Sequence, residues 1–293
     1  MQQSQFGLML ALIGALILTP DSLLMRLSQM DGGAMLAWRA TLAGLVFLAI
    51  GLNKRFQSTD KSIFVFSKSF VALIACQVAN TSFFAFAISL APVAIVLVCV
   101  ATVPIISVVL STIFLNERAS LKSVAVIVTV TLGIVVSVYG DFRTDVAFNL
   151  QTMMGAVFGL AVALSLAINF VIVRQDRNVE FEIALGVGAL IAGITAFVLS
   201  PTASDTTLQS TLIISITGLI ILPLSFVMLS RASRYTTASN VSMLMLLETV
   251  LGPLWVWVFI GERPSYLTIT GGVIVILAIV YFLMSEKQNK TPV

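Results

Sequence analysis

Histidine is absent from the 293 residues, and cysteine occurs only twice, as Cys76 and Cys99. The chain therefore lacks the commonest metal ligand and the usual proton-relay side chain. Both cysteines lie in apolar runs, which favours a packing role over a disulfide. No phosphate-binding G-x-x-x-x-G-K-[ST] loop and no nucleophile paired with a base occur. We therefore expect no metal, no cofactor, no nucleotide-driven pump and no enzyme.

Charged residues are also scarce, at 10% of the chain against 59% hydrophobic residues, and the mean hydropathy is +1.08. Soluble proteins contain about 25% charged residues. This composition excludes a soluble enzyme and indicates a polytopic protein whose first partner is the lipid bilayer. The net charge of +3 indicates membrane topology and not a nucleic-acid partner.

Ten apolar stretches are long enough to cross a bilayer core of about 30 Å as helices. Backbone polar groups cannot stay unpaired in lipid, so we predict an all-α membrane protein with ten transmembrane helices and short loops. The predicted spans are Phe6–Leu24, Met35–Leu52, Phe70–Leu90, Val93–Leu115, Leu121–Tyr139, Met153–Val173, Ile183–Leu199, Leu212–Leu229, Thr236–Ile260 and Leu267–Leu283.

Lysine and arginine divide unevenly between alternate loops. With a cytoplasmic N-terminus, three fall in outer loops, namely Arg26, Arg143 and Arg263. The inner segments hold Lys54, Arg55, Lys61, Lys68, Arg118, Lys122, Arg174, Arg177, Arg231, Arg234, Lys287 and Lys290. Basic residues concentrate on the cytoplasmic side of membrane proteins. We therefore expect an inner-membrane protein with both termini in the cytoplasm.

The two halves of the chain share a pattern. The stretches Phe114–Ser120 and Phe259–Ser265 have Phe, Glu, Arg and Ser in common at an offset of 145 residues. Because each half holds an odd number of helices, the two must have opposite topology. We predict two inverted five-helix repeats, over residues 1–140 and 150–285, which is typical of secondary transporters working by alternating access.

The chain resembles the drug/metabolite transporter superfamily in its ten-helix EamA-like form. The resemblance rests on Trp38-Arg39, on Ala91-Pro92, Pro104 and Phe114 to Arg118, and on Leu247 to Val250 with Phe259 to Arg263. It covers essentially the whole chain. One departure is Thr249, where family members commonly have proline, with Pro253 one turn later. The resemblance implies a substrate site in a central cavity lined by both halves.

Three charged residues stand out inside predicted spans, where a lipid-facing charge would be costly. Glu248 lies near the bilayer midplane and could carry a proton, bind a substrate ammonium or fix helix packing. Arg39 could bind a carboxylate through its planar fork. Asp21 has a depth that would let it pair with Arg39, as a structural pair or an outer gate. We expect substrate binding by Glu248 and Arg39, and a gate or coupling role for Asp21 and Glu248.

Polar and aromatic residues in the same spans complete the predicted site. Gln77, Asn80, Thr81 and Phe84 have the spacing of one helix face. We expect Gln77, Asn80 and Phe84 to contact substrate, and Trp38 to stack on it. Interhelical hydrogen bonding and core packing are the alternatives for each.

We predict structural roles for three prolines and for the two Glu-Arg turns. Pro92, Pro104 and Pro253 can bend helices that rock about the site. Glu117 and Glu262 are expected to cap or pair locally at the membrane surface.

The sequence therefore predicts a secondary transporter of a small organic metabolite, with an amino-acid-like zwitterion as the best fit, export as the direction and a proton as a coupling ion. The alternative solutes are a quaternary ammonium, a nucleoside or a vitamin-like molecule, taken up or exchanged. Outside transport, the alternative is an assembly partner or sensor, whose cavity would be filled by side chains.

Overall fold

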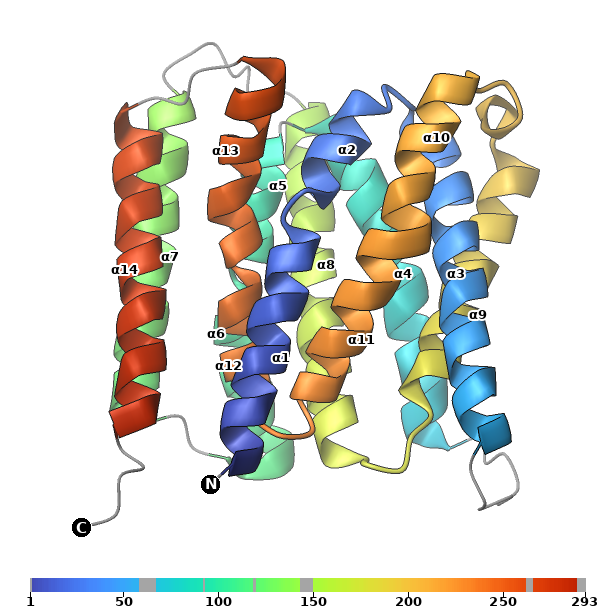
Figure 1. Ribbon diagram of the computed structural model, residues 1–293. Coiled ribbons are helices and arrows are strands. Elements are labelled where there is room, and N and C mark those ends of the chain that lie inside the picture. Colours follow the sequence, from blue (N-terminus) through green and yellow to red (C-terminus); the bar gives the residue numbers. More distant parts are fainter. Residues whose placement is uncertain are drawn as a thin grey trace.

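The computed structural model describes residues 2–57, 67–91, 93–117, 120–142, 150–261 and 266–288. Within these residues the chain forms helices and no strands, arranged as one bundle with α1 and the end of α14 on the same side (Figure 1). We call this the N-terminal side. The α-helices are α1 (Gln2–Leu18), α2 (Asp21–Leu27), α3 (Gly32–Gln57), α4 (Lys68–Leu90), α5 (Val93–Val100), α6 (Val103–Leu115), α7 (Leu121–Phe142), α8 (Leu150–Gln175), α9 (Phe181–Leu199), α10 (Leu208–Ile216), α11 (Leu222–Ala232), α12 (Ala238–Met245), α13 (Leu247–Ile260) and α14 (Tyr266–Gln288). A short 3-10 turn, η1 (Pro201–Ala203), follows α9, and a π-turn, η2 (Thr217–Ile221), joins α10 to α11.

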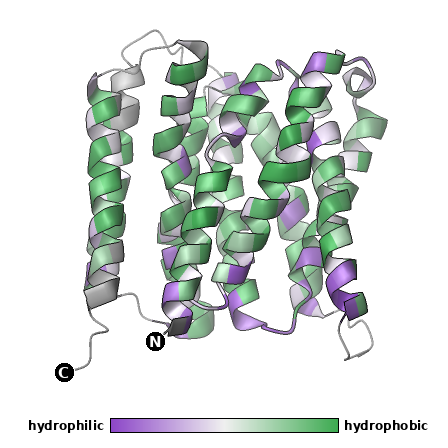
Figure 2. Cartoon of the chain, viewed as in Figure 1, coloured by the Kyte–Doolittle hydropathy of each residue, from purple (hydrophilic) through white to green (hydrophobic). Residues whose placement is uncertain are grey.

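Eight of the ten predicted spans are helical segments long and apolar enough to cross a membrane. Large hydrophobic side chains are exposed along these segments, and hydrophilic residues gather mainly near the ends of the helices (Figure 2). The other two predicted spans coincide with α7 and α14, whose apolar stretches are shorter, at Leu121–Val136 and Ile269–Phe282. The all-α membrane architecture is thus confirmed, while the count of ten crossings stays a prediction.

Four of the spans are interrupted, although we predicted them as continuous helices. The first breaks between α1 and α2, the fourth between α5 and α6, the eighth at η2 and the ninth at Leu246 between α12 and α13. A threonine lies at or close to each interruption and donates its hydroxyl to the carbonyl three residues earlier. These bonds run from Thr19 to Leu16, Thr102 to Cys99, Thr217 to Ile214 and Thr249 to Leu246. Such bonds compete with the helical ladder and help helices bend or stop.

Proline accounts for only part of this pattern. Pro20 precedes α2, and Pro104 and Pro223 lie in the first turn of α6 and α11, where the missing N–H costs nothing. α13 continues through Pro253, and the break of the ninth span lies seven residues earlier at Leu246, so a bend at Pro253 stays a prediction. Pro92 lies outside the described residues.

The offset of 145 residues recurs in the helices themselves. α5 and α12 begin at Val93 and Ala238, and α7 and α14 begin at Leu121 and Tyr266, each pair 145 residues apart. The residues that end α6 and α13, Asn116 and Gly261, are equally spaced and are both left-handed, with φ of 52° and 83°. The fourth span, formed by α5 and α6, and the ninth span, formed by α12 and α13, run in opposite directions through the bundle (Figure 1). The repeat boundaries themselves stay a prediction.

Glycines let α3 and α9 approach closely. A side chain at Gly44 would meet Leu190 and the carbonyl oxygen of Gly186, and one at Gly186 would meet Leu48. Because small residues drive helix association in lipid, this crossing holds the second and seventh spans together.

Gly186→Val should therefore destabilise the folded protein by about 1–3 kcal/mol, because added atoms in a filled interface force the helices apart. Thermal unfolding in detergent measures the change. Ala49→Val is the matched control, since Ala49 lies on the same part of α3 but is exposed. Equal melting temperatures for the two variants would show that the crossing is not tightly packed.

Ion pairs tie the two halves together on the N-terminal side. Lys54 and Arg231 both reach the buried carboxylate of Glu182, at 3.0 and 3.1 Å. Glu117 pairs with Arg174 at 2.9 Å, so the expectation of a local partner for this glutamate was wrong. Glu262 lies outside the described residues.

Loops from both halves also meet on the opposite side. The N–H groups of Gly33 and Ala34 donate to Asp31 Oδ1 at 2.8 and 3.1 Å, which caps α3. Burial acts to raise the pKa of Asp31, but hydrogen bonds from Thr202, Ala34 and Gly33 outweigh it, and the pKa is lowered. The contact from Thr202 joins the loop before α3 to the turn after α9.

Candidate functional site

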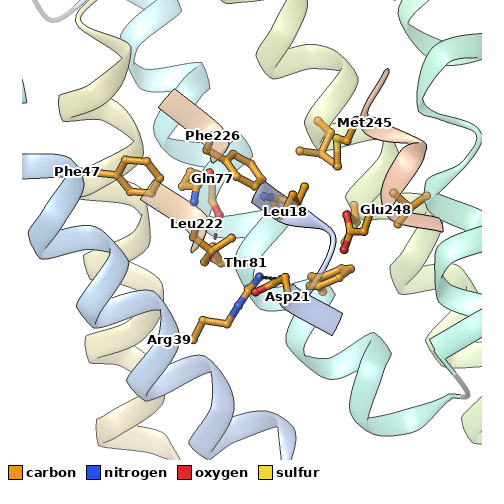
Figure 3. A pocket seen from close by; sticks show the side chains of 15 residues that line it. Leu18, Asp21, Arg39, Phe47, Gln77, Thr81, Leu222, Phe226, Met245 and Glu248 are labelled. Atoms are coloured by element: carbon orange, nitrogen blue, oxygen red, sulfur yellow. Dashed lines mark hydrogen bonds and ion pairs between the residues drawn. The ribbon is translucent and has the colours of Figure 1, made fainter. Parts of the chain in front are cut away.

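A cavity lies in the middle of the bundle, beside the interruptions of the first, fourth and ninth spans (Figure 3). The charged or polar side chains on its wall are Asp21, Arg39, Gln77, Asn80, Thr81 and Glu248. All but Glu248 come from the first half of the chain. The cavity therefore combines a polar wall with one acidic residue from the second half.

Arg39 and Asp21 form a buried ion pair, which confirms the predicted pairing. Arg39 Nη2 lies 2.5 Å from Asp21 Oδ2, and the two side chains are 5% and 1% exposed. Asp21 is the first residue of α2, directly after the break that follows α1, and its side chain is buried in the bundle. The Arg39 guanidinium also lies over the ring of Phe84, 5.4 Å from its centroid.

Each residue of this ion pair keeps one hydrogen-bonding atom without a partner among the described residues. Arg39 Nε and Asp21 Oδ1 are buried and have no hydrogen-bond partner among the described residues. Buried polar atoms are paired in most proteins, so each unpaired atom needs an explanation such as a water or a ligand. Here both atoms belong to residues that line the same cavity.

Glu248 lies in the first turn of α13, directly after the break at Leu246. The residue is 3% exposed, and its Oε1 has no hydrogen-bond partner among the described residues. Figure 3 shows its carboxylate facing the cavity on the side of Asp21. Two acidic groups and one basic group thus share a small volume of low polarity.

The polar face predicted for the third span lies on α4. All four of its residues line the cavity, namely Gln77, Asn80, Thr81 and Phe84. The hydroxyl of Thr81 donates to the carbonyl oxygen of Gln77 at 2.8 Å, so it is already paired. The amides of Gln77 and Asn80 are the remaining neutral polar groups of this wall.

Trp38 does not reach the cavity. Its indole N–H donates to the carbonyl oxygen of Ala203 at 2.9 Å, and its ring packs edge-on against Phe197. Trp38 precedes Arg39 on α3, and consecutive helical residues point in different directions. Trp255 has a structural bond too, since its N–H donates to Thr19 Oγ1 at 3.0 Å and ties α13 to the break after α1.

Sequence reasoning missed the apolar wall. Leu166, Leu222, Phe226 and Met245 line the cavity from the second half. Each lies 145 residues after a cavity residue of the first half, namely Asp21, Gln77, Thr81 and Val100. Applying the repeat offset to the predicted polar residues would have found three of the four.

The cavity is narrow in this conformation. The centre of a water molecule can occupy about 30 Å³ of it. One water needs about 10–15 Å³ by this measure, so the cavity holds about two waters. A metabolite can bind there only after the surrounding helices move apart.

Comparison with known proteins decides the class. The EamA-like transporter family matches residues 5–139 and again residues 153–284. The chain belongs to the EamA-like transporter family. This confirms the resemblance to the drug/metabolite transporter superfamily, and EamA-like proteins are membrane transporters of small solutes.

A solved structure described as "Crystal structure of protein" shares the fold with this EamA-like transporter. The two sequences are 17% identical, the match covers 97% of this chain and 99% of the other, and the TM-score is 0.77. No curated protein matches the chain. The solute must therefore be inferred from the chemistry of the cavity.

Proposed function

We propose that this EamA-like transporter carries a zwitterionic, amino-acid-like solute through the central cavity by alternating access. One observation carries the proposal: buried and unpaired donor and acceptor atoms on Arg39, Asp21 and Glu248 line one cavity. A zwitterion offers both kinds of partner on adjacent atoms.

The head group binds between the two acidic residues and the arginine. The solute carboxylate takes the free Nε–H of Arg39, because guanidinium and carboxylate match in charge and shape. The ammonium binds Glu248 and the free oxygen of Asp21. The solute side chain then packs on the apolar wall of Leu222 and Phe226.

Glu248 also carries the coupling proton in this proposal. A carboxylate so deeply buried is costly to keep charged without a cation beside it. Either a proton or the solute ammonium therefore neutralises Glu248, and the two exchange at this side chain. Exchange of this kind is proton antiport, and it supports export.

The N-terminal side faces the cytoplasm of the inner membrane in this proposal. Lys54, Arg55, Arg174, Arg231 and Arg234 lie at helix ends or in a turn on that side, as the positive-inside rule requires. The helix breaks act as hinges, and the cavity opens alternately to either side.

A quaternary ammonium, nucleoside or vitamin-like solute is the second candidate. Two acidic side chains face one arginine, and Phe47, Phe84 and Phe226 line the same cavity. An excess of acid with aromatic rings suits a cation. A non-transporting partner or sensor would also have a filled cavity, but it would bind no solute.

Ligand-dependent thermal stability tests these candidates. We expect L-serine or L-leucine to raise the melting temperature, with neither the amide nor the N-acetyl form of the same amino acid doing so. A ligand at one hundred times its Kd stabilises the folded state by about 2.7 kcal/mol. Stabilisation by choline alone would favour the second candidate. No stabilisation, together with no flux of these solutes in proteoliposomes, would contradict the proposal.

A further inference from the structure

A second, larger cavity opens on the N-terminal side, where α1, α6, α7, α8 and the α11–α12 turn meet. The centre of a water molecule can occupy about 340 Å³ of it, which is room for a metabolite. Its lining is rich in hydroxyl groups, such as those of Ser4, Ser111, Ser123, Thr237 and Ser239. We call this cavity the hydroxyl chamber.

The only charged residues of the described chain that line the hydroxyl chamber are Glu117 and Arg174. Arg174 Nε and Nη2 both donate to Glu117 Oε1, at 3.1 and 2.9 Å, while Nη1 donates to the carbonyl oxygen of Arg234. Glu117 Oε2 is buried and has no partner among the described residues. The arginine and glutamate are 20% and 29% exposed, so a solute can reach both.

Two unpaired serine hydroxyls follow one face of α6 from the hydroxyl chamber into the bundle. Ser111 lines the chamber, is 4% exposed, and its Oγ has no hydrogen-bond partner in the described chain. Ser107, one turn earlier on the same face of α6, is fully buried and equally unpaired. Along α12, Asn240 lines the chamber and Met245 lines the cavity, five residues and about 7.5 Å apart along the helix axis.

From this arrangement we propose that the hydroxyl chamber is a second binding station for a zwitterionic solute, on the route between the N-terminal side and the central cavity. The solute carboxylate replaces Glu117 on Arg174, and its ammonium binds the released Glu117 carboxylate. One ion pair is exchanged for two, and the hydroxyls satisfy the remaining polar atoms.

The charge balance of the hydroxyl chamber favours a zwitterion over an anion or a cation. One arginine and one glutamate sum to zero, so a solute of either net charge would leave one unpaired charge in the chamber. The α12 N-terminus, capped by Thr237, adds partial positive charge on the side where a carboxylate can bind.

Protection of a single cysteine tests the station. Val108 is half-buried, lines the hydroxyl chamber and has no polar contact to lose, so Val108→Cys in a Cys76→Ala/Cys99→Ala chain gives a reporter. In detergent, L-serine at ten times its Kd should slow modification by a small methanethiosulfonate about tenfold, since a tenth of the sites stay empty. Neither L-serinamide nor N-acetyl-L-serine should protect. Ser204→Cys, exposed on the opposite side, is the control and should react equally fast in all cases.

Substitutions in the hydroxyl chamber test whether the protection arises from solute bound there. Glu117→Gln and Arg174→Gln should each abolish protection by L-serine. Ser111→Ala, which leaves the ion pair intact, should weaken protection and serves if the charge variants fail to fold. Protection by N-acetyl-L-serine, unchanged protection in Ser111→Ala and Glu117→Gln, or no protection by L-serine would each overturn the station.

This inference rests on the proposed zwitterionic solute, and the two can fail separately. Asp21→Asn combined with Arg39→Gln removes the charge pair of the central cavity and leaves the residues of the hydroxyl chamber unchanged. Protection retained in this double variant, with flux of L-serine lost, supports both proposals. Protection retained with flux unchanged contradicts the role of Arg39 and leaves the station standing.

Discussion

Arg39→Gln is expected to lower the free energy of unfolding by about 3–5 kcal/mol and to abolish solute flux. Removing one partner of a buried ion pair leaves the other charge uncompensated, and Asp21 is 1% exposed. The same substitution removes the guanidinium that is proposed to hold the solute carboxylate. Thermal unfolding in detergent and uptake into proteoliposomes measure the two effects.

Two further variants separate stability from function. Asp21→Asn combined with Arg39→Gln removes both charges, so most of the lost stability should return while flux stays absent. Arg55→Gln is the matched control, since its partner Glu180 is 38% exposed and such pairs contribute about 0–1 kcal/mol. A double variant as unstable as Arg39→Gln alone would show that the charge pair is not the cause.

Glu248→Gln is expected to abolish accumulation driven by a pH gradient and also to weaken solute exchange, because the solute ammonium loses a carboxylate that binds it. Glutamine has nearly the shape of the protonated acid but cannot release a proton. In proteoliposomes, accumulation driven by an imposed pH gradient should fall by at least an order of magnitude, to the level set by leakage. Counterflow needs no net proton movement, but it should fall as well, since only the Asp21 carboxylate is left to bind the solute ammonium.

Glu180→Gln provides the control for this comparison, because the Glu180 side chain is only partly buried, at 38% exposure, and lies at the N-terminal side rather than in the cavity. It should leave both kinds of flux intact. Accumulation by Glu248→Gln at the control level would rule out Glu248 as the proton site.

Much of the architecture could be predicted from the composition of the chain and the spacing of its residues. Apolar length predicted eight of the spans, because the bilayer fixes how long a helix must be. The pairing of Asp21 with Arg39 followed from depth, because two opposite charges inside a membrane are costly apart. The polar face of α4 followed from helical spacing alone.

Two features could not be predicted in the same way. The break at Leu246 has no proline or glycine beside it, and an apolar run looks the same whether its helix is continuous or interrupted. The prediction that Trp38 contacts the solute was wrong, because an aromatic residue type does not reveal which way its side chain points. The ring of Trp38 lies on the side of α3 that faces α9. The apolar wall was missed because the sequence alone does not distinguish Leu166 and Leu222 from leucines that face the lipid. Only the repeat offset marks them as cavity residues.

The unequal walls of the central cavity have a stereochemical consequence. The charged and amide side chains other than Glu248 come from the first half, the second half adds the apolar side chains of Leu166, Leu222, Phe226 and Met245, and Glu248 lies at the break in the ninth span. Three different contacts arranged around one α-carbon form a chiral frame. An L-amino acid that fills all three would keep the same orientation throughout the cycle. Its mirror image would have to exchange two of its groups and so give up one contact.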